Sequence, residues 1–398
     1  MKKWENISDY LFFQEGPGVR NHQYTTDGVK LLNVANLVNG RVDLSTSERY
    51  ISSDEAYGKY KHFLADEGDL IIASSGIKVD YFDKKMGFIR KEHLPICMNT
   101  STIRFKSIDK SKLDINYFMY YLKSQSFKDQ LSKQITGSAQ LNFGPSHLKK
   151  MEFPIVDIEE QSSINSVLGN IQSQIRLKEE QLTEYDQLIK SRFVEMFGDP
   201  TSNPNGHDIK SIYELFDVGS SKRVFESEWT DKGVPFYRAR EIVKLAKDGF
   251  VENDLFITEE MYEDYKSKFG VPKANDMMVT GVGTLGVCYI VKDTDRFYFK
   301  DGNTLWFKNK GLCDINFIKN QFDTDFVKDQ IIKNANVSTV GTYTITNAKN
   351  TQVIVPPLSM QKEFAAFVNQ VDKLKFEVQK SLNETQMLFD SLMQEYFG

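Results

Sequence analysis

A glycine-rich loop is the feature of this sequence that comes closest to a cofactor-binding motif. Gly281 to Gly286 reads Gly-Val-Gly-Thr-Leu-Gly, which matches the GxGxxG pattern of nucleotide sites. Such a site needs a helix to begin at the loop, because the helix N-terminus meets the negative charge of the ligand. The residues that follow, Val287 to Val291, are mostly β-branched or aromatic and predict a strand. We therefore expect a strand-connecting loop and no nucleotide or S-adenosylmethionine site.

Other patterns that would support catalysis or metal binding do not occur in the sequence. An amino-methyltransferase would need an Asn/Asp-Pro-Pro-aromatic loop, whereas Pro356-Pro357 lies between Val355 and Leu358. No GxxxxGK[ST], GxSxG or HExxH motif is present. The three cysteines and five histidines stand far apart, which argues against a disulfide framework and a zinc site. We expect a reduced, cytoplasmic protein with no secretion signal, no membrane segment, no metal and no cofactor of its own.

The charge distribution bears on whether the chain could bind nucleic acid. The net charge of −5 disfavours a uniformly basic DNA-binding surface, because phosphate neutralisation supplies much of the affinity. Residues 159–198 carry seven acids and four bases, and residues 358–398 carry six acids and four bases. These two segments account for the whole net charge. A basic surface elsewhere is therefore possible as a local patch.

An internal duplication organises the chain. A shift of 200 residues lays residues 114–198 on 314–398 without a gap, with 17 identities in 85 positions. Chance alone would give roughly five identities. Gln161 meets Gln361, and both copies end on Phe-Gly. The chain is therefore read as two units of about 200 residues each.

Each unit has a strand-rich part followed by a long helix. The strand-rich parts contain short β-branched and aromatic runs between turn signals, with helices expected over 115–135 and 315–334. Apolar residues then recur on a heptad seam in both copies. The first seam contains Ile164, Leu168, Ile171, Ile175, Leu182, Tyr185 and Ile189, and the second contains Phe364, Val368, Val371, Val378, Leu382, Phe389 and Leu392.

The ends of these helices are marked by capping and stop signals. Asp157 and Glu160 suit a capping box in the first copy, and Ser359 is the candidate cap in the second. Gly198-Asp199-Pro200 ends the first helix. At about 1.5 Å per residue each helix would span roughly 55–60 Å. Lys178 and Lys375 interrupt the two seams at different positions, which would fix the register of an antiparallel pair.

These elements predict an α+β protein with a pseudo-twofold duplication, in which two similar globular domains are separated by two long antiparallel coiled-coil helices. We expect a first domain at 1–157, a helix at 158–198, a linker at 199–208, a second domain at 209–357 and a helix at 358–398. An ordinary amphipathic helix pair on a core is the alternative for the long helices. Two readers held apart by a rod suit a bipartite DNA site.

Several segments resemble the specificity subunits of type I restriction-modification enzymes. Thr136 to Phe143 followed by Leu148 to Pro154 is similar to the end of a target-recognition domain in that family, as is Tyr57 to Tyr60 leading into Glu67 to Ile71. The segment from Arg192 to Pro200 and the Pro356-Pro357-Leu358 helix start are also similar. The resemblance covers the whole chain in the family's order. In the second copy, Ser338 to Thr346 has no match to Gln140 or Asn142, so the two domains are expected to read different half-sites.

The resemblance implies a non-catalytic subunit with a role in DNA defence. Each target-recognition domain would read one half of a bipartite site on double-stranded DNA, and the helices would set the spacer. The expected protein partners are two methyltransferase subunits, with restriction subunits in the full complex. S-adenosylmethionine, ATP and Mg²⁺ would then serve the partner subunits.

Candidate DNA contacts follow from the resemblance and from residue chemistry. Arg, Gln and Asn read base edges, whereas Lys mostly meets phosphate. The candidates lie in expected loops; they are Arg20, Lys59, Lys61, Ser75, Lys78, Gln140 and Asn142 in the first domain, and Lys222, Arg223, Arg238, Arg240, Thr284, Thr342 and Tyr343 in the second. A solvated surface role is the alternative for each of them. For the whole chain, the alternatives are a coiled-coil scaffold that binds only proteins and a self-contained methyltransferase.

Overall fold

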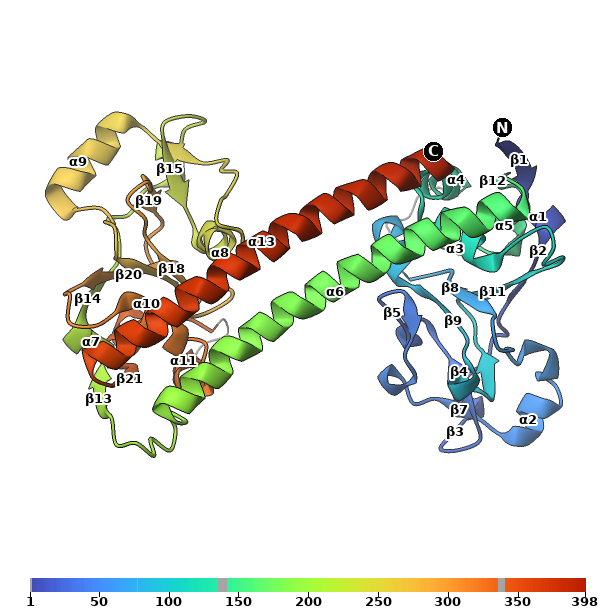
Figure 1. Ribbon diagram of the computed structural model, residues 1–398, viewed down its shortest axis with the longest axis horizontal. Helices are drawn as coiled ribbons and strands as arrows, with labels where there is room; N and C mark the ends of the chain where they lie inside the picture. Colours follow the sequence, from blue (N-terminus) through green and yellow to red (C-terminus); the bar gives the residue numbers. More distant parts are fainter. Residues whose placement is uncertain (1, 77, 135–141, 336–340) are drawn as a thin grey trace. The chain divides into compact units, whose positions relative to one another are not determined.

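The computed structural model describes residues 2–76, 78–134, 142–335 and 341–398 (Figure 1). The chain forms two compact units, Met1–Glu179 with Lys380–Gly398 and Glu180–Gln379. Each unit holds one α+β domain, the first half of the long helix that follows this domain and the second half of the other long helix. The predicted fold class is confirmed. The compact units divide inside the long helices, so each unit includes parts of both.

The first domain is built on a four-stranded antiparallel sheet in the order β2-β11-β8-β9. A second sheet has the order β10-β4-β7-β3, and β1 pairs with β12 beside the long helix. The strands are β1 Lys3–Asn6, β2 Leu11–Glu15, β3 Tyr24–Thr25, β4 Val29–Leu32, β5 Leu37–Val38, β6 Arg41–Val42, β7 Tyr50–Ile51, β8 Leu70–Ala73, β9 Met86–Phe88, β10 Ile96–Met98, β11 Thr102–Ser107 and β12 Glu152–Ile155. The helices are α1 Ile7–Tyr10, α2 Ser53–Tyr57, α3 Ile115–Lys123, α4 Gln125–Gln134, α5 Pro145–Leu148 and α6 Ile158–Phe197.

The second domain repeats this plan. Its central sheet has the order β14-β20-β17-β18, its second sheet β16-β15-β19, and β13 pairs with β21. The strands are β13 Asp208–Ser211, β14 Phe216–Gly219, β15 Val234–Tyr237, β16 Phe256–Ile257, β17 Met277–Thr280, β18 Cys288–Ile290, β19 Tyr298–Phe299, β20 Thr304–Asn309 and β21 Gln352–Val355. The helices are α7 Ile212–Leu215, α8 Ala239–Asp248, α9 Glu259–Phe269, α10 Ile315–Gln321, α11 Asp325–Ala335, α12 Ile345–Asn350 and α13 Leu358–Phe397.

The glycine-rich loop connects two antiparallel strands. Residues 281–287 lie between β17 and β18, and Val279 pairs with Cys288 across the connection. No helix begins within this described segment, as the strand-like sequence after Gly286 predicted.

Each of two predicted helices is divided into two shorter helices in the structure. The helix expected over 115–135 is α3 followed by α4, because Ser124 ends the first and its hydroxyl accepts from the Phe127 amide that opens the second. The helix expected over 315–334 divides in the same way, into α10 and α11. Hydroxyl residues compete with the helical backbone for hydrogen bonds, so Ser124 and Thr324 stand at the breaks.

The long helices α6 and α13 are single and unbroken, with 40 residues each (Figure 1). The Asp157 carboxylate accepts from the Glu160 amide at 2.8 Å, which is the N-terminal cap that the sequence predicted. Gly198 follows α6 with a φ of 75°, a conformation that glycine adopts without strain. The Ser359 cap was wrong: α13 begins at Leu358, and the Pro357 carbonyl accepts the first helical hydrogen bonds.

The apolar seams pack in opposite directions inside each unit. In the first unit, Ile164 and Leu168 share a core with Met393 and Phe397, so the start of α6 meets the end of α13. In the second unit, Phe193 and the start of α13 share a core in the same antiparallel sense. The predicted pairing residues are all buried or half-buried; they are Ile164, Leu168, Ile171, Ile175, Leu182, Ile189, Phe364, Val371, Val378, Leu382 and Phe389.

Lysines occupy the polar positions in both seams. The Lys178 ammonium donates to Thr385 Oγ1 at 2.5 Å and to the Ser381 carbonyl at 3.3 Å. Lys375 donates to Asp186 Oδ1 at 2.6 Å in the other unit. Each lysine has a partner that a shifted register would remove, so the two contacts select one alignment of the seam.

Candidate nucleic-acid interface

Four loops of the first domain meet at one end of its central sheet. The Gly16 amide donates to the Thr102 carbonyl at 2.9 Å, and the Ser74 amide donates to the Ser101 carbonyl at 2.8 Å. Phe143 in turn donates to the Ser74 carbonyl at 3.0 Å. These backbone bonds join the end of β2, the start of β11, the end of β8 and the segment before α5. We call this surface the first tip.

Two predicted DNA contacts come together on the first tip. Ser75 and Asn142 form an antiparallel bridge, and the Ser75 hydroxyl donates to Ser101 Oγ at 2.6 Å. Asn142 and Lys78 are exposed, whereas Ser75 is half-buried. Gln140 lies outside the described residues. The bridge therefore places an exposed amide, which can read a base edge, beside the β8 loop.

The close approach of the backbone explains a glycine at the first tip. A Cβ at Gly16 would lie 2.1 Å from the Asn99 carbonyl oxygen, inside contact distance. Asn99 is buried and its amide donates to Asn33 Oδ1 at 2.9 Å, which links the tip to the second sheet. A side chain at Gly16 would separate these segments.

Arg20, Lys59 and Lys61 lie on a neighbouring part of the first domain, and all three are exposed. The Gln23 side chain accepts from the Arg20 amide at 3.0 Å and donates to Glu55 Oε1 at 2.8 Å. The Arg20 turn is thus fixed to α2, which precedes both lysines. Three cations are thereby held on adjoining segments.

A buried arginine that the sequence analysis did not select supports the lysine-bearing segment. Arg104 donates to the carbonyls of His62 and Leu64, each at 2.8 Å, and lies 3.5 Å from Asp69 Oδ2. Burial raises the pKa of Asp69, and the cations Lys106 and Arg104 offset part of this shift. No signal in the sequence pointed to its burial, because alternation along β11 places Arg104 on the opposite face of the sheet from the buried Ile103 and Phe105.

The loops of the second domain meet at the corresponding end of its central sheet. The Ser220 hydroxyl, just after β14, donates to the Thr304 carbonyl at 3.1 Å, and the Gly281 amide donates to the Asn303 carbonyl at 2.8 Å. Tyr343 donates to the Gly281 carbonyl at 2.9 Å, which joins the segment before α12 to the others. We call this surface the second tip. It contains the exposed candidates Lys222, Arg223 and Thr284 and the half-buried Thr342.

The prediction that Tyr343 contacts DNA was wrong. Its side chain is fully buried in the core of the second domain. Its hydroxyl lies 2.7 Å from Thr351 Oγ1, and burial raises the pKa of the phenol. The ring packs in the apolar core of the second domain and so anchors the segment before α12, which forms part of the second tip.

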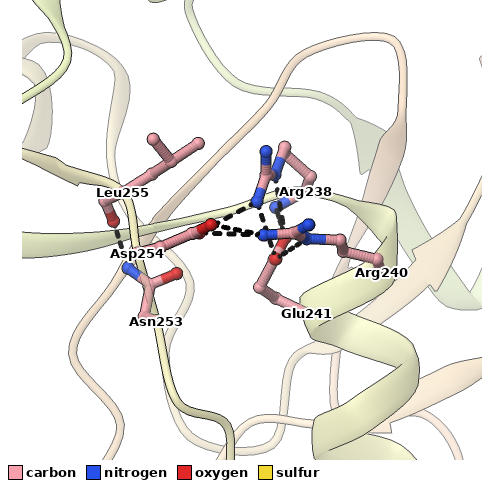
Figure 2. Close-up of polar contacts among 6 residues, drawn as sticks. All are labelled: Arg238, Arg240, Glu241, Asn253, Asp254 and Leu255. Carbon is pink, nitrogen blue, oxygen red and sulfur yellow. Dashed lines mark hydrogen bonds and ion pairs between the residues drawn. The ribbon is translucent and has the colours of Figure 1, made fainter. Parts of the chain in front are cut away.

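Arg238 and Arg240 form an ion-pair cluster at the start of α8 (Figure 2). Arg238 donates from Nη2 to Glu241 Oε1 and to Asp254 Oδ1, each at 3.0 Å. The Arg240 Nη2 donates to both oxygens of Asp254 at 2.9 and 2.8 Å, and its Nε donates to Glu241. Two arginines and two carboxylates thus form one network.

The two carboxylates of this cluster differ in environment. Burial raises the pKa of Glu241, but the hydrogen bonds from Arg238 and Arg240 outweigh it and the net pKa is lowered. The hydrogen bond from Arg240 lowers the pKa of Asp254. Both groups are therefore anionic at neutral pH. Sequence reasoning missed both; Glu241 stands three residues after Arg238, a capping-box spacing, whereas nothing in the sequence pointed to Asp254.

A repeated set of glutamines attaches each domain to its long helix. Gln161 in α6 and Gln361 in α13 each accept at 2.9 Å from the amide of the aspartate that caps an earlier helix, Asp114 of α3 or Asp314 of α10. Gln130 and Gln330 each hold the amide and the carbonyl of one residue in β12 or β21. We call these four glutamines the joint. They were visible as identities between the copies, but their partners were not.

A groove of about 810 Å³ lies in each unit between the break at Ser124 or Thr324 and the long helices. The two grooves are lined at equivalent positions of the duplication. These pairs include Lys123 and Asp323, Ser124 and Thr324, Lys128 and Lys328, Gln172 and Asp372, Phe389 and Ile189, and Met393 and Phe193. The duplication therefore repeats a concave surface as well as a fold.

Among the described residues, no three His, Cys, Asp or Glu side chains lie close enough to hold a metal ion. No helix of the described part of the chain is long and apolar enough to cross a membrane.

The sequence profile of the type I restriction modification DNA specificity domain matches residues 22–185 and again residues 204–385. The chain therefore belongs to this family and carries its domain twice. A putative type I restriction enzyme specificity subunit of Haemophilus influenzae is 22% identical over 280 residues, which are 69% of this chain and 68% of the relative. The type I restriction enzyme MjaIX specificity subunit of Methanocaldococcus jannaschii is 22% identical over 326 residues, 77% of this chain and 73% of that one.

Two solved structures share the fold. The type I restriction-modification S subunit from M. genitalium aligns with a TM-score of 0.56 at 16% identity, over 100% of this chain and 96% of that chain. A structure from a study of complex assembly and conformational transition in the type I system aligns with a TM-score of 0.57 at 12% identity, over 99% and 97%. At these identities the likeness supports the fold alone.

Proposed function

We propose that this chain is the DNA-sequence-specificity subunit of a type I restriction-modification complex, in which each tip reads one half of a bipartite site. The observation that carries the proposal is the pair of tips, which stand at the same end of equivalent sheets but present different side chains. The first tip presents Asn142 and Lys78, and the second presents Lys222 and Thr284. Family membership supports the role in DNA specificity.

The chain contributes recognition, and the chemistry belongs to its partners. The tips supply amides, hydroxyls and cations, which bind bases and phosphates but do not activate a methyl group or a water molecule. Adenine methylation would use S-adenosylmethionine on methyltransferase subunits. Cleavage would use ATP and Mg²⁺ on restriction subunits.

The long helices and the paired grooves support the docking of two methyltransferase subunits. Exposed apolar side chains lie along both helices, among them Leu177, Leu188, Leu374, Phe376, Met387 and Leu388. Large apolar side chains on an exposed helix mark a protein interface when they cluster. Because the grooves stand at equivalent positions, two copies of one partner fit this chain better than a single asymmetric partner.

The test is co-expression of the chain with the methyltransferase subunit of the same system, followed by single-molecule sequencing of methylated adenines. We expect one bipartite motif with a fixed gap, and we expect it to disappear when this chain is omitted. Methylation that is absent, or whose sequence does not depend on this chain, would reject the proposal in favour of a protein-binding scaffold. A matched control carries Glu263→Gln, which removes one exposed charge on α9.

A further inference from the structure

The cluster of Arg238, Arg240, Glu241 and Asp254 contains one carboxylate that is fixed and one that is accessible (Figure 2). The Glu241 side chain is 2% exposed and also accepts from the Arg238 backbone amide at 2.9 Å. The Asp254 side chain is 64% exposed, and the Arg240 side chain that it binds is 59% exposed. Glu241 therefore belongs to the interior, whereas Asp254 covers the guanidinium groups from the solvent side.

The strand register explains why Asp254 reaches the two arginines. β15 and β16 are antiparallel, with Val234 opposite Ile257 and Pro235 opposite Phe256. Continuing this register places Asp254 opposite Tyr237, one residue before Arg238. Leu255 extends this pairing, because its carbonyl accepts from the Phe236 amide at 2.9 Å. Asp254 is thus carried by the segment 249–255, which leads from α8 into β16, the strand paired with β15.

The charges of the cluster leave room for one exchangeable anion. Arg238, Arg240 and Glu241 together carry a net charge of +1, which Asp254 neutralises. A phosphodiester group carries one negative charge and presents oxygens that guanidinium groups bind in the same paired manner as a carboxylate. The cluster also adjoins the second tip, because the Lys300 amide donates to the carbonyl of Tyr237, immediately before Arg238, and the next residue, Asp301, accepts from Arg223 of the second tip at 2.9 Å.

We infer that Arg238 and Arg240 form a binding site for a DNA backbone phosphate, and that Asp254 occupies this site until DNA displaces it. The inference rests on the proposed function, since it concerns how the second tip meets DNA. Glu241 keeps Arg238 in place during the exchange through the contacts at Nε, Nη2 and the amide. Arg240 exchanges the two oxygens of Asp254 for two oxygens of the phosphate.

Such an exchange weakens every encounter with DNA by the same amount, whatever the sequence. Exposed ion pairs contribute little, so the bound phosphate replaces Asp254 readily once the remaining contacts of a correct site have formed. On an incorrect site, few other contacts offset the loss of the Asp254 pair. Asp254 is therefore expected to limit non-specific binding without changing the sequence that is read.

The experiment measures binding of the assembled complex to a fluorescent 30-base-pair duplex without the recognition sequence, over a series of salt concentrations. Asp254→Asn should tighten binding about three- to fivefold at low salt. It should also steepen the slope of log K against log salt by about 0.9, as one added phosphate contact requires. Asp254→Glu, which retains the carboxylate, should bind as the wild type does.

Two further variants separate this exchange from a general effect of charge. Glu263→Gln removes one exposed carboxylate from the same domain and should change binding less than twofold. The double variant Arg240→Ala with Asp254→Asn should lose the gain. Tightening by Glu263→Gln equal to that by Asp254→Asn, or a gain that survives without Arg240, would overturn the inference. Wild-type complex that binds DNA while Asp254→Asn has no effect rejects this inference alone, whereas no DNA binding by any form rejects the proposed function as well.

Discussion

The joint is the same in the two copies of the duplication, whereas the tips differ. At the joint, Gln161 and Gln361 accept the equivalent amide at the same distance, and Gln130 and Gln330 hold the equivalent residue of the adjoining strand. At the tips, the loop after β8 and the loop after β17 differ in length and in sequence. The bonds that attach the helix were kept, and the residues that can face DNA diverged. This is the pattern expected if two different half-sites are read from one common frame.

The interior between joint and tip shows an intermediate case. Asp69 and Asp276 are both buried at the start of the third strand of the central sheet. Arg104 and Lys106 balance the first, whereas the second accepts from Trp306 Nε1 at 2.8 Å. The carboxylate was kept and its partner was replaced. Arg104 also binds the carbonyls of His62 and Leu64, in the segment that follows Lys61. The difference between the two buried partners is therefore connected to a difference between the two surfaces.

A change in the length of both helices should have the largest effect. Four helical residues inserted between Glu180 and Gln181, and four between Lys380 and Ser381, lengthen each helix by about 6 Å. The tips stay unchanged, so we expect the same two half-sites with a gap longer by about two base pairs. Mapping of methylated adenines measures the gap. An active complex with the original gap would show that the helices do not set the spacing.

Removal of the partners of the two buried aspartates should lower the free energy of unfolding by different amounts. Arg104→Ala removes a charge partner from Asp69 and leaves two carbonyls without a donor, so we expect a loss of about 3–5 kcal/mol in the free energy of unfolding. Trp306→Phe removes one of three hydrogen bonds to Asp276 and keeps most of the ring, and should cost about 1–3 kcal/mol. Urea denaturation followed by circular dichroism measures both. Equal losses would mean that Arg104 and Trp306 stabilise their aspartates to the same extent, which would contradict this prediction.

The joint should respond equally in its two copies. Gln161→Ala and Gln361→Ala each leave the amide of a capping aspartate without its acceptor, and we expect each to lower the free energy of unfolding by about 1–3 kcal/mol. Agreement between the two losses within about 1 kcal/mol is the expected result in the same denaturation experiment. A loss confined to one copy would contradict an equivalent joint.

Substitutions on the tips should leave stability almost unchanged. Asn142 and Thr284 are exposed, so Asn142→Ala and Thr284→Ala should alter the free energy of unfolding by less than about 0.5 kcal/mol. The control is Tyr343→Ala, which empties a buried position of the second domain and should cost several-fold more. A large loss in the free energy of unfolding from Asn142→Ala would show that Asn142 stabilises the fold, contrary to this prediction.

The duplication and the helices could be predicted from the sequence because they depend on period and identity. Heptad spacing identified the buried positions of α6 and α13, and the identities identified the glutamines of the joint. The cluster of Arg238 could not be predicted, because Asp254 reaches it through the pairing of β15 with β16 across α8, and no local pattern specifies that register. Tyr343 was misplaced for a related reason: position in a tip segment does not decide which of its side chains point inward. The DNA contacts themselves stay predictions.

The separate recognition of two half-sites is tested most directly by changing one tip at a time. One variant carries Lys78→Ala and Asn142→Ala, and the other carries Lys222→Ala and Thr284→Ala, each co-expressed with the methyltransferase subunit. Sequencing of methylated adenines should show that the first variant relaxes one half of the motif and the second relaxes the other half, with the gap unchanged. Relaxation of both halves by either variant, or of neither half by both, would contradict the account.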